Sequence, residues 1–286
     1  MKVISTKKEL AGIISDKKEK GLTVGFVPTM GALHEGHLSL VREARNNSDY
    51  VVVSIFVNPT QFNNPDDLKS YPRDIDKDLK MLEELSVELI FAPTVKEMYP
   101  EEDTRQFDFG MLDKVMEGKF RPGHFNGVAQ VVSKLFDYVK PDKAFFGEKD
   151  FQQLAIIRKL VKDLKMPVDV VGCPIVREPD GLAMSSRNQL LAPEMRKNAP
   201  VIAETLFDSL NFAPGKTVKE TGQLVTERIN ATGVLKVEYF DIVDGNTLQP
   251  VNSWDESDYI VGCIAVFAGK VRLIDNVTYK NTSHEH

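Results

Sequence analysis

The chain contains little cysteine and no long apolar run, and these absences exclude several classes of protein. Its 286 residues include two cysteines, too few for the disulfide framework of a small secreted domain. No apolar stretch approaches the roughly 20 residues of a membrane span, and the N-terminus lacks the apolar core of a signal peptide. The formal net charge of -6 argues against a broad nucleic-acid surface, which is normally basic. We therefore expect a cytoplasmic globular protein without a membrane or nucleic-acid partner.

Apolar and amphipathic segments alternate through residues 1–175. The pattern predicts strands at residues 22–27, 50–57, 87–91, 143–146 and 168–171, and helices at residues 38–46, 75–85, 125–138 and 151–164. Strands that are apolar throughout, separated by helices, indicate a parallel sheet covered on both faces. We therefore predict a doubly wound, Rossmann-like α/β domain over residues 1–175, with its ligand outside the carboxyl ends of the strands.

The pattern changes after residue 175. Helices are predicted at residues 193–210 and 218–230, and strands at residues 237–243, 259–267 and 271–274. Helices followed by clustered strands indicate a smaller α+β domain over residues 176–286. Residues 281–286 are expected to form a disordered tail.

Two of the chain's five histidines stand three residues apart, His34 and His37, between a predicted strand and a predicted helix. Free backbone N–H groups and the positive end of the helix dipole favour a phosphate at such a turn, and imidazoles beside it donate hydrogen bonds as charge moves during a reaction. Two other interpretations stay open. The histidines can be an accidental helix cap or a metal site, although their spacing differs from the zinc pattern His-Glu-x-x-His and Cys173 and Cys263 offer no ligand cluster.

Two further segments carry groups that bind anions. Ser185, Ser186 and Arg187 follow Met184 in a polar stretch, where hydroxyls and a guanidinium bind anionic oxygen; the alternative is a polar linker between domains. In residues 146–150, Gly147 permits close approach of a ligand and Lys149 adds a mobile positive charge. Asp150 in the same segment is equally suited to capping the next helix.

Amides follow the second predicted strand, at Asn58 and Gln61. Because amides both donate and accept hydrogen bonds, they suit the recognition of a small polyhydroxy acid, although loop amides are often only solvated. Residues 121–128 precede a helix and either hold an anion or shape a turn. Residues 71–76 have the pattern of an ordinary helix start.

Taken together, these segments resemble the nucleotidylyltransferase superfamily, which shares its adenylate-forming architecture with class I aminoacyl-tRNA synthetases. The His-x-Gly-His turn is similar to the HIGH motif, and the Ser-rich loop ending in Arg187 is similar to the KMSKS motif. Six blocks together resemble the pantothenate synthetase (pantoate–β-alanine ligase) family: residues 28–37, 56–62, 71–73, 121–125, 146–153 and 184–187. The resemblance runs over nearly the whole chain and is less diagnostic after Leu191.

The resemblance implies an enzyme of pantothenate and coenzyme A biosynthesis that joins (R)-pantoate to β-alanine. Pantoate attacks the α-phosphorus of ATP to give pantoyl adenylate and pyrophosphate, and β-alanine then displaces AMP. In this scheme His37 assists the departure of pyrophosphate, Lys149 neutralises phosphate charge, and the smaller domain closes over ATP as a lid.

The resemblance also assigns residues to each ligand. Implied catalytic residues are His34, His37, Lys149, Ser185, Ser186 and Arg187. Implied ATP contacts are Pro28, Thr29, Met30, Gly31, Ala32, Leu33, His34, Glu35, Gly36, His37, Gly147, Glu148, Lys149, Asp150, Val176, Met184, Ser185, Ser186 and Arg187. Implied contacts with pantoate and β-alanine are Met30, Asn58, Gln61 and Gln153.

Magnesium is expected on the ATP phosphates, because hard oxygen ligands suit it. Asp76, Asp78 and Asp150 are candidate supports, and the sequence does not choose among them. The resemblance further suggests a homodimer. Rival functions are nucleotidyl transfer to a phosphorylated acceptor, tRNA charging, which the acidic chain disfavours, and nucleotide sensing without turnover.

Overall fold

The computed structural model describes residues 1–63 and 65–282, and the chain divides into two compact units. The first unit comprises Met1–Phe109, Arg121–Glu148 and Gln153–Pro174, and the second comprises Gly110–Phe120, Lys149–Gln152 and the chain from Ile175 onward. Two segments that precede residue 175, at 110–120 and 149–152, therefore pack with the second unit. Lys149 and Asp150 lie in the second of these segments.

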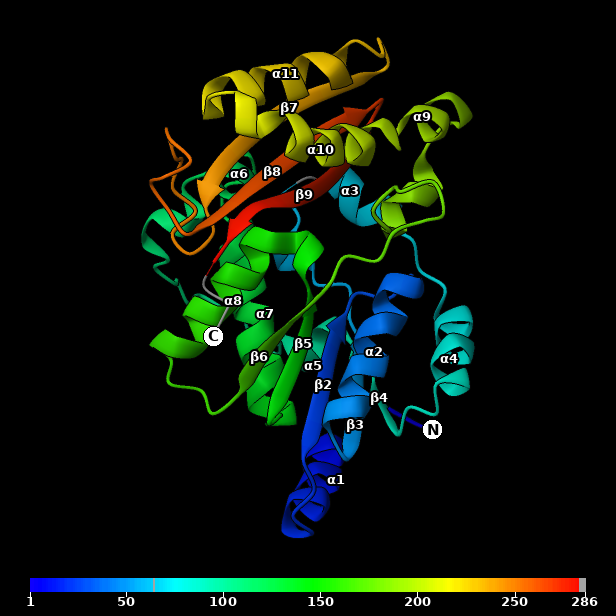
Figure 1. Cartoon of the computed structure of the whole chain (residues 1–286). Helices are drawn as coiled ribbons and strands as arrows, with labels where there is room; N and C mark the ends of the chain where they lie inside the picture. Colours follow the sequence, from blue (N-terminus) through cyan, green and yellow to red (C-terminus); the bar gives the residue numbers. More distant parts are fainter. Residues whose placement is uncertain (64, 283–286) are drawn as a thin grey trace. The chain divides into compact units, whose positions relative to one another are not determined.

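A parallel sheet forms the centre of the first unit, with the strand order β1-β4-β3-β2-β5-β6 (Figure 1). The strands are β1 (Lys2–Ile4), β2 (Val24–Thr29), β3 (Tyr50–Ile55), β4 (Leu89–Phe91), β5 (Lys143–Gly147) and β6 (Asp169–Cys173). All pairings within it are parallel. The Rossmann-like class and the predicted strands are confirmed. β1 was not predicted, because three residues carry too little periodicity.

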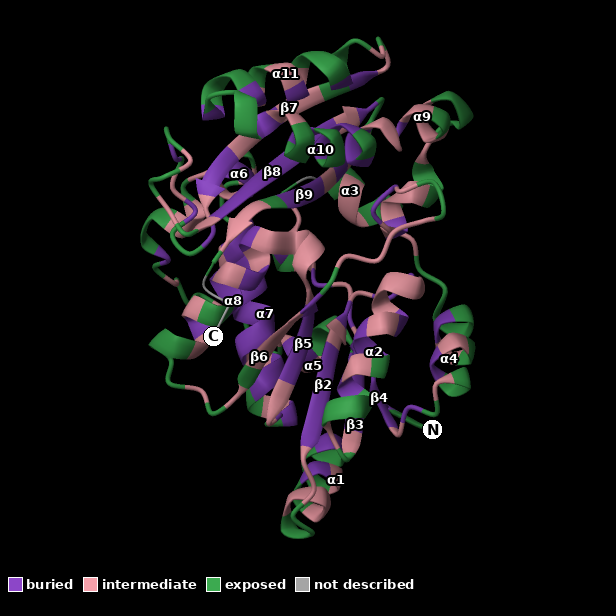
Figure 2. Cartoon of the chain, viewed as in Figure 1, coloured by how far each residue is buried: buried purple, intermediate pink, exposed green. Residues whose placement is uncertain are grey.

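Helices cover both faces of this sheet. Those of the first unit are α1 (Lys7–Glu19), α2 (Glu35–Asn47), α3 (Pro65–Ser70), α4 (Ile75–Glu84), α5 (Val95–Met98), α7 (His124–Val139) and α8 (Phe151–Asp163), whose first two residues belong to the second unit. Because successive strand residues point to opposite faces, Val27 packs in one core with Val41 of α2 and Leu82 of α4. Its neighbour Phe26 meets Phe136 of α7 edge-on at 6.3 Å. Figure 2 shows the resulting burial of β2 and β5.

The adjacent strands β2 and β5 lie at the middle of the sheet, and their carboxyl ends mark the expected ligand site. β2 pairs with β3 on one side and with β5 on the other. From β2 the chain continues through β3 and β4 toward one edge of the sheet, and from β5 it continues to β6 at the other edge. The carboxyl ends of β2 and β5 therefore lie at the topological switch point, where α/β sheets bind ligands. β5 pairs with β2 only at Gly25 and Phe26, so Pro28 lies beyond that ladder and costs no hydrogen bond to β5.

The second unit has a three-stranded antiparallel sheet, ordered β7-β8-β9. Its elements are α6 (Met116–Phe120), α9 (Pro193–Asn198), α10 (Val201–Phe212), α11 (Val218–Asn230), β7 (Leu235–Asp244), β8 (Tyr259–Ala268) and β9 (Val271–Asn281). Ile202 and Leu206 of α10 and Val225 of α11 pack on one face of this sheet. On β9, Arg272 binds Glu117 of α6 through two hydrogen bonds of 2.6 and 2.8 Å.

Three expectations for the second unit are corrected. The predicted helix 193–210 is two helices, α9 and α10, with Pro200 between them, because proline has no backbone N–H to donate and so interrupts the helical hydrogen bonds. β9 continues to Asn281, well past the predicted end at residue 274. The expected tail begins too early, because Asn281 ends β9 and the N–H of Thr282 donates to the carbonyl of Asp258 at 3.0 Å. Residues 283–286 of that tail lie outside the described residues.

Candidate active site

The chain between β2 and α2 makes a sharp turn that contains two left-handed residues. Gly31 has a φ of 77° and Ala32 a φ of 51°. This conformation costs an alanine roughly 1–2 kcal/mol, whereas glycine adopts it freely. Contacts elsewhere in the fold must therefore hold Ala32 in place, and they come from α4.

The carboxylate of Asp78 on α4 holds this turn. Its two oxygens accept the backbone N–H groups of Ala32 (2.9 Å) and Leu33 (2.7 Å), and the residue is 2% exposed. Burial raises the pKa of the Asp78 carboxyl, and the two N–H donors oppose that rise. The N–H of Gly31 donates to Oγ1 of Thr29 at 3.2 Å. The expectation of free N–H groups is therefore wrong for these three residues of the turn.

His34 and His37 cap the start of α2 with their own side chains. Nδ1 of His34 accepts the N–H of Gly36 at 3.2 Å, and Nδ1 of His37 accepts the N–H of His34 at 3.4 Å. The two ring centroids are 4.1 Å apart. A nitrogen that accepts a hydrogen bond carries no proton, so each neutral ring holds its proton on Nε2. The rings therefore act as helix caps through Nδ1 while Nε2 is the hydrogen-bond donor of each ring.

Asn58 fixes the orientation of Gln61, which lies in the short helix η1 (Pro59–Gln61). Nδ2 of Asn58 donates to Oε1 of Gln61 and to the carbonyl of Gly127, each at 3.1 Å. The amide nitrogen of Gln61 then points at Sδ of Met30, 3.4 Å away. Asn58 is 1% exposed and Gln61 is 8% exposed. Gln61 thus presents its N–H₂ group beside the turn, whereas both N–H bonds of Asn58 are used inside the protein.

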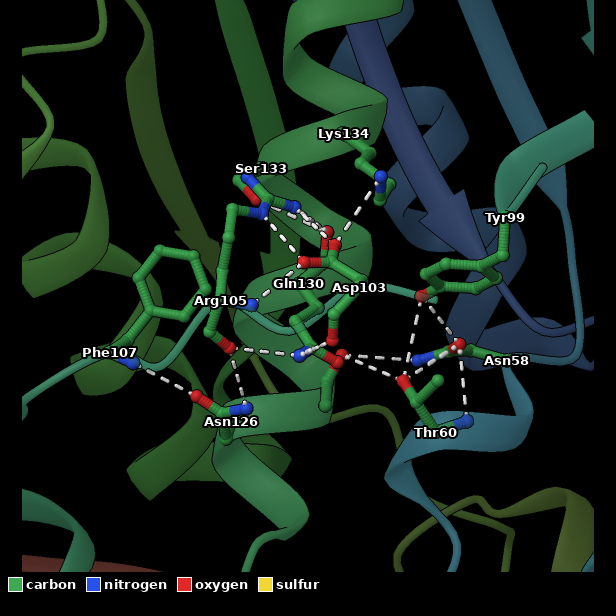
Figure 3. A network of polar contacts seen from close by, with 11 residues as sticks. Asn58, Thr60, Tyr99, Asp103, Arg105, Phe107, Asn126, Gln130, Ser133 and Lys134 are labelled. Atoms are coloured by element: carbon green, nitrogen blue, oxygen red, sulfur yellow. Dashed lines mark hydrogen bonds and ion pairs between the residues drawn. The ribbon is translucent and has the colours of Figure 1, made fainter. Parts of the chain in front are cut away.

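Figure 3 shows that Asn58 is held in turn by a polar network between η1 and α7. Its Oδ1 accepts the hydroxyl of Tyr99 at 2.9 Å and that of Thr60 at 3.2 Å. At the far side of the network, Asp103 binds Arg105 at 2.6 Å and Lys134 at 3.3 Å. The network explains why neither oxygen nor nitrogen of the Asn58 amide needs a ligand.

The segment 121–128 supports η1. Nδ1 of His124 lies 2.8 Å from the carbonyl of Gln61. A Cβ atom at Gly127 would stand 2.4 Å from the carbonyl oxygen of Thr60, so only glycine permits this approach of α7 to η1. Of the two interpretations left open for this segment, the structure supports the shaping of the chain.

The second unit carries Lys149, Asp150 and residues 184–187. Lys149 and Asp150 lie in η3 (Glu148–Asp150), with Nζ of Lys149 3.6 Å from Oδ2 of Asp150. Ser185 caps the short helix η4 (Ser186–Leu190), its Oγ accepting the N–H of Arg187 at 3.2 Å. The N–H of Met184 donates to the carbonyl of Val176 at 3.0 Å, which closes residues 176–184 into a loop.

The predicted site residues are thus divided between the units. Within the first unit the structure brings Met30, Asn58 and Gln61 together beside the turn that leads to His34 and His37. The remaining candidates of that unit are Pro28 and Thr29 in β2, Gly31, Ala32 and Leu33 in the turn, Glu35 and Gly36 in α2, Gly147 at the end of β5, Glu148, and Gln153 on α8. In the second unit Val176 and Met184 are joined, and Lys149, Asp150, Ser185, Ser186 and Arg187 share the same unit.

Several residues that build the site were not singled out from the sequence. Tyr99 holds η1 through Asn58, and Asp78 was considered only as a support for magnesium. Gly127 was considered only as part of the segment 121–128. No local motif marks Tyr99 or Asp78 for these roles, because each acts on a segment far away in the chain.

The described residues contain no group of three histidine, cysteine or acidic side chains that could hold a metal ion. Asp78 already accepts two backbone N–H groups. Both cysteines are buried, and burial raises the pKa of the Cys173 thiol to about 12, which keeps it protonated at neutral pH. Within residues 1–63 and 65–282, no helix has the length and apolar character needed to cross a membrane.

A Rossmann-like parallel sheet with a His-x-Gly-His turn at its switch point defines an α/β protein that binds its ligand at the carboxyl ends of the strands. The chain belongs to the pantoate-beta-alanine ligase family, whose model matches residues 2–278. It is therefore an enzyme of the carbon–nitrogen ligase class.

Individual relatives agree with the family assignment over their full lengths. A pantothenate synthetase of Bacteroides fragilis is 58% identical over 282 residues, covering 99% of this chain and 100% of the relative. A crystal structure of pantothenate synthetase from Thermus thermophilus has a TM-score of 0.92 and 46% identity, covering 98% of this chain and 100% of that one. A pantoate-beta-alanine ligase from Francisella tularensis, complexed with beta-gamma ATP and beta-alanine, has a TM-score of 0.83 and 38% identity, with 98% of both chains covered.

Proposed function

We propose that this enzyme condenses (R)-pantoate with β-alanine in an ATP-dependent reaction that passes through pantoyl adenylate. Family membership supports the overall reaction, and the ligands of the relative from Francisella tularensis support ATP and β-alanine as substrates. The observation in this structure that carries the proposal is the pair His34 and His37, whose Nδ1 atoms both accept backbone hydrogen bonds. The pair thereby holds two Nε2–H donors at the switch point of the sheet.

The first step forms the adenylate. A carboxylate oxygen of pantoate attacks the α-phosphorus of ATP, and the bond from that phosphorus to the bridging oxygen of pyrophosphate breaks. Negative charge then grows on the departing pyrophosphate. Donors that are already in position stabilise such charge without rearranging, and we assign this role to Nε2–H of His34 and His37, with His37 acting on the leaving group. The ammonium of Lys149 adds a positive charge to the same phosphates.

Pantoate is assigned to Gln61. Its amide nitrogen is turned toward Met30 because Asn58 holds its oxygen, so it offers a donor to a hydroxyl or carboxylate oxygen of the substrate. Asn58 acts through Gln61 in this scheme, and Gln153 supplies a further contact. A donor with a fixed orientation discriminates against acids that lack the matching oxygen, because its own hydrogen bond is then lost.

The second step forms the amide. The neutral amine of β-alanine attacks the carbonyl carbon of the adenylate, the bond from carbon to the AMP oxygen breaks, and the nitrogen loses a proton. AMP is a far better leaving group than the oxide of a free carboxylate. This step involves no triphosphate, and its demands on Lys149 and on residues 184–187 are correspondingly smaller.

The remaining contacts with ATP are assigned to both units. Gly147 ends β5 with open space around the position of a Cβ atom, so the fold does not itself require glycine there; we assign that space to the nucleotide, with Glu148, Asp150 and Val176. Residues 184–187 of the second unit are proposed to close over the triphosphate. Hydroxyls of Ser185 and Ser186 and the guanidinium of Arg187 would then contact its oxygens.

Magnesium enters this scheme as part of the substrate Mg-ATP. The described residues offer no three-ligand protein site for it, and magnesium on nucleotides keeps many water and phosphate ligands. In this scheme the phosphates of ATP and water molecules hold the magnesium ion.

We also propose a cytoplasmic location and a homodimer. Two buried free thiols suit a reducing compartment, and the dimer follows from the family resemblance. Sedimentation equilibrium of the purified chain tests the second point, because a single species of twice the chain mass is expected.

The function is tested by the release of AMP and pyrophosphate from Mg-ATP, with pantoate and β-alanine omitted in turn and pantothenate detected by mass. We expect AMP in equal amount to pantothenate only when both substrates are present. Pyrophosphate should appear with pantoate alone, up to one equivalent of enzyme. Lys149→Ala protein purified in the same way serves as the control for contaminating host enzyme.

Other outcomes identify the rivals. A released adenylylated product, with no effect of added amine, would indicate nucleotidyl transfer. No pantoate-dependent release from a folded protein that binds ATP would overturn the proposal.

A further inference from the structure

β9 contains two consecutive buried polar residues in the middle of the second unit's core. Asp275 is 4% exposed and Asn276 is 9% exposed. Consecutive residues of a strand point to opposite faces of the sheet. Asp275 shares its face with Leu273 and Val277, which pack in the core with α10 and α11. Asn276 points to the other face. Burying a carboxylate is costly unless it is paired, and burying an amide is costly unless it is hydrogen-bonded. Both side chains therefore need specific partners.

Asp275 binds the segment that leads into residues 184–187. Its carboxylate receives both terminal nitrogens of Arg177, at 2.7 and 3.0 Å, in a two-pronged ion pair. The same guanidinium donates to the carbonyl of Gly181 at 3.2 Å and stacks over the ring of Phe207 at 4.8 Å. Arg177 also pairs with Ala183 in an antiparallel bridge. The ion pair therefore fixes both arms of the loop 176–184, directly before Ser185.

Asn276 binds the segment that carries Lys149. Its Nδ2 donates to the backbone carbonyl of Lys149 at 3.2 Å. The same short segment is held a second time by Gln152, whose amide donates to the carbonyls of Leu112 (2.7 Å) and Val115 (2.9 Å). All of these residues belong to the second unit. The backbone from which the Lys149 side chain extends is thus fastened to β9.

We propose that Asp275 and Asn276 are positioning residues that hold the two phosphate-binding segments of the second unit at one fixed spacing. β9 supplies one rigid strand, Asp275 fastens residues 176–184 to it, and Asn276 fastens Lys149 to it. The inference rests on the proposed function, because the spacing matters only if Lys149 and residues 184–187 act on the same triphosphate. Displacing a group by about 1 Å in such a site costs up to roughly a hundredfold in rate.

The test separates positioning from simple stability. Asn276→Leu removes the donor and keeps a side chain of similar size, and Asp275→Asn removes the charge partner of Arg177. Tyr279→Phe is the matched control, because Tyr279 lies on the same strand and its hydroxyl is 2.6 Å from Oγ of Ser209 on α10, a contact that involves neither loop. Each variant is measured for thermal unfolding, for pantoate-dependent exchange of labelled pyrophosphate into ATP, and for aminolysis of added pantoyl adenylate by β-alanine.

We expect Asn276→Leu and Asp275→Asn to slow pyrophosphate exchange by roughly tenfold to a hundredfold and to leave aminolysis at the wild-type rate. Tyr279→Phe should lower the unfolding temperature and change neither rate. Equal losses in both partial reactions, or an exchange rate like that of Tyr279→Phe, would overturn the inference. Should Asp275→Asn fail to fold, Asn276→Leu decides alone. Absence of exchange in the wild-type protein would instead overturn the proposed function, and this inference with it.

Discussion

The carboxylate of Asp78 accepts the backbone N–H of Leu33 at 2.7 Å, and its second oxygen accepts the N–H of the preceding alanine at 2.9 Å. A single buried side chain of α4 thus holds the left-handed turn from which α2 and both histidines follow. Asp78→Asn replaces one accepting oxygen by an N–H₂ group that faces a backbone N–H. A buried donor without an acceptor costs about 1–3 kcal/mol.

We expect Asp78→Asn to lose stability by that amount and to slow pantoate-dependent pyrophosphate exchange by roughly tenfold or more, because the histidines shift with the turn. Chemical unfolding and the exchange assay measure the two effects. Glu84→Gln changes an exposed carboxylate of the same helix and should alter neither. Wild-type stability and rate in Asp78→Asn would show that the turn holds its shape without the carboxylate.

His37→Ala and Lys149→Ala should each slow adenylate formation by about a hundredfold or more while the protein stays folded, since a donor in a preorganised site is worth that much. Circular dichroism checks the fold, and single-turnover release of pyrophosphate measures the step. Lys236→Ala, at an exposed position of β7, is the control for loss of a lysine. A loss below about threefold in either variant would remove that residue from the mechanism.

Binding of Mg-ATP should slow hydrogen exchange in residues 184–187, because closure over the triphosphate removes their N–H groups from solvent. Mass spectrometry of peptides from the free and the ATP-bound protein measures the change. β8, which is buried and paired on both sides, is the internal reference. Exchange that stays the same in residues 184–187 would identify them as a static linker.

Gly127→Ala and Gly222→Ala should change stability in opposite directions. Both glycines lie within helices, where alanine is favoured by up to about 1 kcal/mol. At Gly222 of α11 the added methyl group meets nothing within 4 Å, so the substitution should stabilise the protein. At Gly127 it would stand 2.4 Å from the carbonyl oxygen of Thr60, and overpacking of this kind costs roughly 1–3 kcal/mol.

Urea unfolding of both glycine variants measures the change in the free energy of unfolding, which should fall for Gly127→Ala and rise for Gly222→Ala. Gly127→Ala should also raise the KM for pantoate, because η1 and Gln61 are displaced with the backbone of Thr60. Stabilisation by both substitutions would mean that α7 and η1 separate without cost.

Asp103→Asn should destabilise the protein in a pH-dependent way. Hydrogen bonds from Arg105 lower the pKa of the Asp103 carboxyl from 3.8 to about 2, and its side chain is 3% exposed. A pKa lowered in the folded state gives stability that is present above about pH 4 and lost as the pH falls toward 2. The variant should therefore lose roughly 2 kcal/mol at neutral pH, and its curve should converge with the wild type in acid.

Unfolding free energies measured between pH 2 and 7 test this prediction, with the exposed Asp255→Asn as control. If the difference in unfolding free energy between wild type and Asp103→Asn did not depend on pH, the charge of Asp103 would not be the cause of its stabilising effect.

The local spacing of apolar residues predicted the helices and strands that bury a continuous apolar stripe, and it failed for those that do not. α7 was found at almost its true length, because it buries a dense set of apolar residues from Phe125 to Val139. α1 was not predicted, since its buried residues are only Leu10 and Ile14 within a charged helix. β9 was predicted to stop at residue 274 because Asp275 and Asn276 break the apolar pattern; the strand continues because both have partners elsewhere in the fold.

By itself, the sequence determined the α/β class, the position of the His34–His37 turn after a strand, and the family, since each is carried by residues close together in the chain. Only the tertiary structure decided that Asp78 holds that turn, that Asn58 orients Gln61, and that Lys149 belongs with the second unit. Those relationships join segments that are 3 to 127 residues apart. The long-range contacts, those of Asp78 with the turn and of Asn276 with Lys149, form only after the sheets bring distant segments together. No short-range periodicity in the sequence encodes such contacts.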